Sequence, residues 1–288
     1  MYCFFDGRDD GTEYDEFRKS SGFTQEKYLE RVRRTALYLV ERLGNADVLV
    51  LEEIEDAGVL RDLLDYGLKS VGFRYFGLAQ NETGMLSVGF LSKDEPLDVK
   101  VHGIEGSRLI LELEFLVGGE SVHVYGIHGK SKVSDEDGTV RKEEFTLLSS
   151  LARDTEGAVI LCGDFNSDPA DGGKEMGILR GPHAVDCPLL VTGDGGATKD
   201  GVFYSPFFDY ETKPEVEGTY FYDGSWSFLD HILLDRRSFD GQGLEYDSST
   251  VLHPKEATDY SGRPSRYEVS TGQGFSDHFA VSVTLRYT

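Results

Sequence analysis

The chain has 288 residues, of which 39% are hydrophobic and 12% aromatic, enough apolar material to fold around a buried core. It carries 52 acidic and 29 basic side chains, so its formal net charge is −23 at pH 7. A field of that sign repels polyanions, which excludes tight binding to a phosphate backbone unless local basic residues or divalent cations reverse it. The sequence contains no run of about 18 apolar residues, so no membrane-spanning helix is predicted.

The three cysteines, Cys3, Cys162 and Cys187, are too few for a disulfide framework and lack paired metal-ligand spacing. Cys162 lies inside an apolar run and is interpreted as a small core residue. The first residues have neither the basic nor the apolar region of a signal peptide. The compartment is therefore left open, with export expected only if the natural chain has an upstream signal peptide.

The first predicted helix covers about Thr24–Leu43, because apolar residues recur there at steps of three and four. Thr24 is suited to cap its start, and Gly44 to end it. Its basic residues are assigned to a solvated face: Lys27, Arg31, Arg33 and Arg34.

Strands and helices alternate along the rest of the chain. Strands are predicted over Asp47–Ile54, Met85–Leu91, Leu109–Val117, Val122–His128, Val159–Asn166, Ser227–Asp235 and Ser276–Arg286. Two further helices are predicted over Ala57–Leu68 and Glu143–Arg153, whereas residues 170–227 are interpreted as loops with short elements. This alternation, without a Pro- or Ser-rich linker, predicts one α/β domain with its chemistry at the strand ends.

Polar residues concentrate at five of these strand ends: Glu52-Glu53, His128, Asp164-Phe165-Asn166, Asp230-His231 and Asp277-His278. A strand end lets a side chain leave the core while its backbone stays fixed, as catalysis requires. Taken singly, Glu53 is interpreted equally well as an exposed acid, and His128 is interpreted better as a hydrogen-bonded structural histidine. The joint order of the five groups favours a catalytic site.

Five ordered segments resemble motifs of the endonuclease/exonuclease/phosphatase superfamily: Leu51–Ile54, His128–Lys132, Gly163–Asn166, Leu229–Leu233 and Ser276–His278. The resemblance runs from near residue 1 to about residue 283 and is strongest to bacterial nuclease-like members. It implies a deoxyribonuclease-I-like fold, a four-layered α/β sandwich in which two β-sheets lie face to face and helices flank them. It also implies hydrolysis of a phosphate ester with Mg²⁺ or Mn²⁺.

The resemblance also implies a role for each matching residue. Glu53 is the main metal carboxylate, and Asp277 is a second acid near the metal. Asp164 orients or deprotonates the attacking water, while Asn166 holds the scissile phosphate. His278 stabilises the phosphate or acts as a general base.

Two more matching residues complete this set, since Asp230 orients His278 and His128 acts as the general acid for the leaving oxygen. Carboxylates without cysteine suit Mg²⁺, which prefers oxygen ligands. Phosphoryl transfer concentrates negative charge on the phosphate, which needs a cation and hydrogen-bond donors. Arg108 and Lys130 are candidate substrate-binding residues, with ordinary exposed bases as the alternative.

The chain departs from the family pattern at its start. Family members have a first strand whose Asn joins the metal site, followed by residues like Phe4-Phe5-Asp6, so that this Asn falls before Met1. The domain over residues 1–288 is therefore expected to lack that strand, and the natural product to be longer. Ile127 replaces a polar residue before His128, and Ser227–His231 lacks the Trp of inositol phosphatases, which disfavours that branch.

The leading prediction for function is a divalent-metal-dependent phosphodiesterase, an endonuclease on DNA or RNA that acts as a monomer. One alternative is an enzyme for small phosphoesters or phospholipid head groups, which the acidity favours. A membrane-contacting aromatic hairpin would support it, but Phe203–Tyr210 is interpreted as a core segment. The other alternative is a non-catalytic module that binds ligand or metal without hydrolysis.

Overall fold

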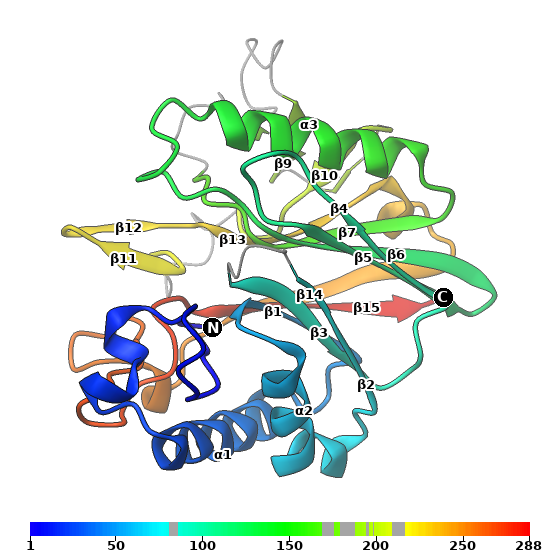
Figure 1. Cartoon of the computed structure of the whole chain (residues 1–288). Coiled ribbons are helices and arrows are strands. Elements are labelled where there is room, and N and C mark those ends of the chain that lie inside the picture. The colour runs from blue at the N-terminus through cyan, green and yellow to red at the C-terminus, as the bar shows by residue number, and fades with distance from the viewer. Residues whose placement is uncertain (81–85, 169–175, 179–187, 194–195, 198, 209–216) are drawn as a thin grey trace. The chain divides into compact units, whose positions relative to one another are not determined.

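The computed structural model describes residues 1–80, 86–168, 176–178, 188–193, 196–197, 199–208 and 217–288. The chain divides into two compact units, the first built from Met1–Pro96 and His253–His278 and the second from Leu97–Leu252 and Phe279–Thr288. Each unit contains strands, and helices of both are seen in Figure 1. In the part of the chain that is described, no helix is long and apolar enough to cross a membrane. The single domain stays a prediction.

The first unit contains two α-helices, a three-stranded sheet and several short 3-10 helices. The helices are α1 (Gln25–Leu43) and α2 (Ala57–Tyr66), and the antiparallel sheet has the order β1 (Val48–Ile54), β3 (Ser87–Ser92), β2 (Tyr75–Ala79). The 3-10 helices are η1 (Asp15–Phe17), η2 (Lys19–Ser21), η3 (Leu68–Val71) and η8 (Lys255–Ala257). Both helices contribute apolar side chains to one core with β1. The strand β2 was not predicted.

The helix α1 confirms the predicted boundaries but not the predicted solvated face. The Thr24 side chain accepts a hydrogen bond from the Lys27 amide, and Tyr28 and other residues of the apolar stripe are buried. Of the four basic residues assigned to solvent, Arg33 alone is exposed. Arg31 is buried, so its assignment is wrong; it lies among aromatic rings rather than in water.

The second unit is organised around an eight-stranded mixed sheet. Its order is β4 (Asp98–His102), β5 (Ile110–Val117), β6 (Glu120–His128), β7 (Ala158–Asp164), β13 (Asp230–Leu234), β10 (Val202–Tyr204), β9 (Leu189–Thr192) and β8 (Met176–Ile178). The pairing of β6 with β7 is parallel, whereas β13 runs antiparallel to β7. The edge strand β4 was not predicted.

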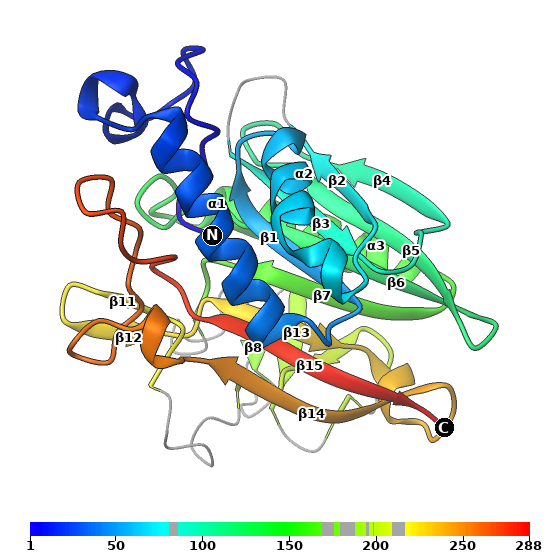
Figure 2. The same cartoon turned by 90° about the horizontal axis from the view of Figure 1, so that it is seen from below.

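Among the described residues of this unit, one α-helix and two strand pairs accompany the sheet. The helix α3 (Thr139–Asp154) lies beside the sheet in Figure 1. Its Phe145 and Leu148 belong to one buried apolar cluster with residues of the sheet strands. The strands β11 (Tyr220–Tyr222) and β12 (Ser225–Ser227) form a hairpin. The longer pair β14 (Leu244–Leu252) and β15 (Ala280–Tyr287) runs antiparallel in Figure 2, and β14 was not predicted.

Two sequence interpretations concern residues of this unit. Phe203, Phe207 and Phe208 are buried, which confirms a core segment there, while residues 209 and 210 lie outside the described residues. Cys162 is buried, as predicted, and Cys187 also lies outside the described residues.

A carboxylate at the end of β13 gives a pH-dependent contribution to stability. Asp235 accepts a hydrogen bond from the Arg237 amide at the start of η7 (Arg236–Phe239), and burial raises its pKa from 3.8 to about 6 against the opposing charge of Arg237. Between these values the folded state binds more protons than the unfolded state, so this contribution falls as the pH rises.

Asp235→Asn is therefore expected to match the wild type near pH 4 and to be more stable by about 2 kcal/mol at pH 8. Asparagine caps a helix as well as aspartate does, so the local fold is kept. Urea unfolding of both proteins at the two pH values measures the difference. An equal difference at both pH values would contradict the raised pKa.

Candidate active site

Three neighbouring strands of the second unit bring His128, Asp164 and Asp230 into one row. His128 ends β6 and lies opposite Asp164 at the end of the parallel strand β7. Asp230 begins the antiparallel strand β13 and also lies opposite Asp164. All three are buried, with exposed fractions of 6%, 7% and 8%. The structure thus places three predicted site residues side by side at the ends of three central strands.

The turn after β7 orients the Asp164 carboxylate. Gly163 has φ 131 and Asn166 has φ 48, both in the left-handed region that bends the chain sharply. The Asn166 amide N–H donates to Asp164 Oδ1 at 2.7 Å, and Asn166 Nδ2 donates to Asp164 Oδ2 at 3.1 Å and to the Gly129 carbonyl at 3.0 Å. Phe165 between them is fully buried in the core. Phe165 therefore anchors the turn in the core, and Asn166 holds the Asp164 carboxylate through hydrogen bonds.

The loop after β6 is held close to this turn. The Gly129 amide donates to the Asp164 carbonyl at 2.8 Å, which continues the pairing of β6 with β7 beyond His128. His128 Nε2 lies 3.7 Å from Asp164 Oδ2, so the imidazole and the carboxylate face each other. Two side chains that can exchange protons therefore lie side by side at the ends of paired strands.

Asp230 is positioned by Thr219, which no sequence pattern singled out. The Thr219 hydroxyl accepts hydrogen bonds from the Leu229 amide at 3.1 Å and the Asp230 amide at 3.3 Å. Its carbonyl accepts a third from the Phe279 amide at 2.8 Å. Thr219 is fully buried, so these bonds are shielded from water.

The neighbouring His231 has a structural role. It is fully buried, with Nε2 3.0 Å from the Phe228 carbonyl and Nδ1 3.4 Å from the Ser205 hydroxyl. Burial lowers the pKa of His231, which favours its neutral form. It therefore packs the core behind Asp230.

The two predicted substrate-binding cations lie around a buried acid of α3. Glu144 accepts hydrogen bonds from the Lys130 amide at 2.9 Å and from the Ser107 hydroxyl. Burial raises the pKa of Glu144, and the positive charge of Arg108 opposes that rise. The Lys130 ammonium donates to the Gly106 carbonyl at 2.9 Å. Both cations are thus held near the loop that follows His128, and their binding of substrate stays a prediction.

In the first unit, a β-bulge aims the Glu53 side chain. Leu51 pairs with Gly89 and Ile54 with Ser87, so two residues of β1 lie opposite Val88 alone. Glu53 has φ 61, an uncommon value for a residue with a side chain. Its carboxylate Oε2 accepts a hydrogen bond from the Cys3 amide at 2.7 Å. Such a bulge redirects a side chain out of the regular strand pattern.

Asp277 belongs to the same unit and interacts electrostatically with Glu53. Burial raises the pKa of Asp277, the negative charge of Glu53 raises it further, and His278 opposes the rise. The pKa of the buried Cys3 thiol is raised by burial and by both carboxylates. These groups therefore share a region of negative potential, which a divalent cation bound through carboxylate oxygens would offset. The donor set fits Mg²⁺ or Mn²⁺.

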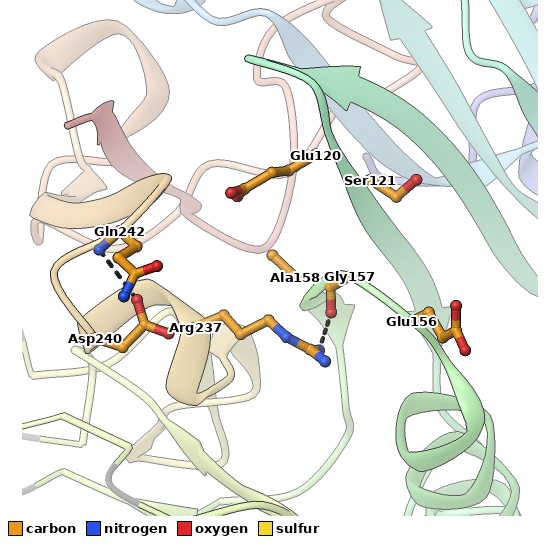
Figure 3. A pocket seen from close by; sticks show the side chains of 8 residues that line it. All are labelled: Glu120, Ser121, Glu156, Gly157, Ala158, Arg237, Asp240 and Gln242. Carbon is orange, nitrogen blue, oxygen red and sulfur yellow. Dashed lines mark hydrogen bonds between the residues drawn. The ribbon is translucent and has the colours of Figure 1, made fainter.

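The second unit also contains an open cleft of about 410 Å³ (Figure 3). It is lined by Glu120, Ser121, Glu156, Gly157, Ala158, Arg237, Asp240 and Gln242. Its strand residues come from the opposite ends of β6 and β7, roughly 20 Å along the strands from Asp164. The cleft is therefore separate from the row of His128, Asp164 and Asp230.

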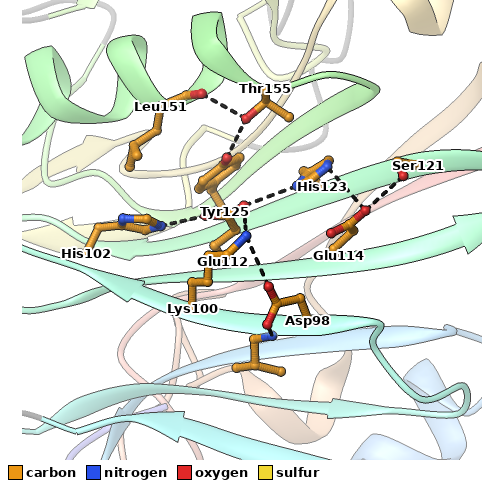
Figure 4. Close-up of polar contacts among 11 residues, drawn as sticks. Asp98, Lys100, His102, Glu112, Glu114, Ser121, His123, Tyr125, Leu151 and Thr155 are labelled. Carbon is orange, nitrogen blue, oxygen red and sulfur yellow. Dashed lines mark hydrogen bonds and ion pairs between the residues drawn. The ribbon is translucent and has the colours of Figure 1, made fainter.

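A second cluster of polar side chains lies on β4, β5 and β6 and contains no predicted site residue (Figure 4). Glu112 of β5 lies between His102 Nε2 at 2.5 Å and His123 Nδ1 at 3.2 Å. Burial raises the pKa of Glu112, but its contacts with the two histidines and with Lys100 lower that pKa by more, so the net shift is downward. The group links three adjacent strands at the outer end of the sheet.

The chain matches one protein family over most of its length. A sequence profile described as the endonuclease/exonuclease/phosphatase family matches residues 21–278. TDP2 from D. rerio, solved with a single-strand DNA product, is 14% identical with a TM-score of 0.61, over 89% of this chain and 92% of that one. TDP2 from Caenorhabditis elegans is 17% identical with a TM-score of 0.60, over 92% of this chain and 72% of that one.

A toxin structure is similar as well. Beta toxin 275-280 from Staphylococcus aureus is 18% identical with a TM-score of 0.51, over 90% of this chain and 92% of that one. No curated protein matches the chain. At these identities the likeness shows the fold, and it confirms the predicted α/β fold class.

Proposed function

This chain belongs to the endonuclease/exonuclease/phosphatase family, and on that premise we propose that it is an endonuclease that hydrolyses phosphodiester bonds of DNA or RNA with Mg²⁺ or Mn²⁺. Membership makes it a metal-dependent phosphoesterase, and the earlier resemblance is confirmed. The observation that carries the proposal is the row of His128, Asp164 and Asp230 on adjacent strand ends, with Asn166 bonded to Asp164.

The proposed mechanism begins with Asp164 as the proton acceptor for the attacking water. Hydrogen bonds from Asn166 hold the Asp164 carboxylate in one orientation, which reduces the reorganisation that the reaction requires. Both amide hydrogens of Asn166 are donated, one to Asp164 and one to Gly129. The predicted contact of Asn166 with the phosphate therefore requires release of one of these bonds.

The remaining roles follow from the family resemblance. His128 protonates the leaving oxygen, His278 stabilises the phosphate or accepts a proton, and Asp230 has the role of an orienting residue. Glu53 and Asp277 would hold the metal. A bound divalent cation supplies positive charge where negative charge develops on the phosphate oxygens.

Nucleic acid as the substrate is supported by the TDP2 structure that contains a single-strand DNA product. The net charge of −23 opposes it, because a polyanion interacts with the field of the whole chain. Arg108 and Lys130 are the candidates for reversing that field locally. The acidity instead favours a small phosphoester, which interacts with fewer charges.

Cleavage of supercoiled plasmid by the purified chain tests the proposal. Nicking is expected with Mg²⁺ or Mn²⁺ and is expected to stop with EDTA and in Asp164→Asn. Two parallel assays use other substrates. One measures release of nitrophenol from bis-p-nitrophenyl phosphate, and the other measures release of head groups from phospholipid vesicles. Hydrolysis of these alone would replace the nuclease by a small-ester or lipid enzyme. Metal binding without any hydrolysis would identify a binding module.

Salt dependence distinguishes the two classes of substrate further. Phosphate contacts release counterions, so nicking is expected to fall steeply between 50 and 200 mM salt in excess Mg²⁺, by about tenfold or more. Hydrolysis of bis-p-nitrophenyl phosphate by the same preparation is the control, and it is expected to change much less. A flat response of nicking would contradict binding through phosphate contacts.

A further inference from the structure

Arg31 is a buried cation behind the Glu53 bulge. It is 2% exposed, and its guanidinium carbon lies 4.2 Å from the ring centroids of both Phe4 and Tyr267. Burial lowers the pKa of Arg31 to about 10, so it remains charged at neutral pH. Within the described ranges no carboxylate forms an ion pair with it. A buried charge without an ion pair is costly, so its retention needs a reason.

The hydrogen bonds of Arg31 lead directly to Glu53. Its guanidinium donates to the Tyr2 carbonyl and, from Nη1 at 2.9 Å, to the Cys3 carbonyl. The Tyr2 carbonyl and the Cys3 amide belong to one peptide group, and that amide donates to Glu53 Oε2 at 2.7 Å. Arg31 and Glu53 therefore bind opposite ends of the same peptide group, an arrangement in which each hydrogen bond strengthens the other.

The backbone at both ends of this link is strained. Cys3 has φ 39 and Glu53 has φ 61, and residues with side chains keep such conformations only where their surroundings hold them. The Phe4 amide donates to the Glu53 carbonyl at 2.8 Å, and the Glu55 amide to the Phe4 carbonyl at 3.2 Å. The segment from Tyr2 to Phe4 is thus held by hydrogen bonds to the end of β1 and to Arg31.

We infer that Arg31 is a positioning residue for the Glu53 carboxylate and acts on it through the Tyr2–Cys3 peptide group. The inference rests on the proposed role of Glu53 as a metal ligand. Arg31 fixes the direction of the Cys3 N–H, so that Glu53 is oriented before a cation arrives. Without Arg31, the carboxylate must be ordered during binding, and affinity falls by the cost of that ordering.

The test is a titration of the full chain with Mn²⁺, followed by electron paramagnetic resonance of the free ion. Arg31→Met is expected to weaken Mn²⁺ binding about tenfold, equivalent to about 1.4 kcal/mol. The Mn²⁺ affinity of Arg31→Lys is expected to lie between those of the wild type and Arg31→Met. Lysine keeps the charge but lacks the rigid fork that reaches two carbonyls. Arg33→Met makes the same change at the exposed neighbour on α1 and is expected to bind like the wild type.

A double-mutant cycle separates positioning from a general loss of structure. If Arg31 acts through Glu53, Arg31→Met changes Mn²⁺ affinity far less in a Glu53→Gln background than in the wild type. Circular dichroism reports whether each variant is folded, and Arg31→Lys carries the test if Arg31→Met does not fold. Folded Arg31 variants with wild-type Mn²⁺ affinity, or additive effects in the cycle, would overturn the inference.

The same titration separates this inference from the proposed function. Unchanged Mn²⁺ affinity in Glu53→Gln removes Glu53 as a ligand, and the inference with it. Mn²⁺ binding that depends on Glu53 and Arg31, in a chain that hydrolyses no phosphoester, rejects the proposed function and leaves the positioning role intact.

Discussion

Asp164→Asn is expected to lower the rate of phosphodiester hydrolysis by about a thousandfold, because the amide cannot accept a proton from water. The Asn166 amide N–H still finds an oxygen acceptor in the variant. Asn166 Nδ2 meets an amide nitrogen in place of Oδ2, so the cost to stability is about 1 kcal/mol. Single-turnover rates on plasmid and thermal unfolding of the same preparation measure both effects.

Asp235→Asn is the matched control for that variant. It makes the same chemical change beyond the other end of β13, and its rate is expected to equal that of the wild type. A folded Asp164→Asn variant with wild-type turnover would remove Asp164 from the mechanism. An equal loss in the two variants would show that the effect is not specific to the row of strand ends.

Glu53→Gln is expected to raise the concentration of Mg²⁺ needed for half-maximal activity by at least about tenfold, because one ligand charge is lost. The glutamine carbonyl can still accept the Cys3 amide, so the β1 bulge is kept. Activity is expected to recover partly at saturating metal. Rates measured across a Mg²⁺ series, with ionic strength held constant, give the shift.

Glu52→Gln provides the comparison, since Glu52 occupies the same bulge. Its Mg²⁺ requirement is expected to stay close to that of the wild type. A Glu53→Gln titration that coincides with the wild-type curve would exclude Glu53 from the metal site. A similar shift in both variants would mean that net charge, rather than ligation by Glu53, controls metal binding.

The elements with strong local patterns were predicted, and those without them were missed. The helix α1 has a capping Thr24 and a continuous apolar stripe, so its boundaries followed from the sequence. The edge strand β4 has exposed Val99 and Val101 on one face and charged residues on the other, so neither face has the signature of burial. It is a strand because β5 supplies its pairing. Strands such as β14 are likewise defined by their partners.

Residues of the candidate site likewise divide into those that the sequence predicted and those that it did not. His128, Asp164 and Asp230 were predicted because each adjoins an apolar strand, and the register confirms that they lie together. Arg31 and Thr219 were not recognised, since their partners lie far along the chain or across a hairpin. A basic residue on an amphipathic helix resembles its solvated neighbours until the rings that enclose it are known.

The peptide group that connects Arg31 to Glu53 has a practical consequence for the design of expression plasmids. An affinity tag fused ahead of Met1 is joined one residue before the Tyr2–Cys3 peptide, whereas a tag after Thr288 follows β15. Preparations tagged at either end should therefore be compared for their metal requirement before low activity is assigned to the protein itself.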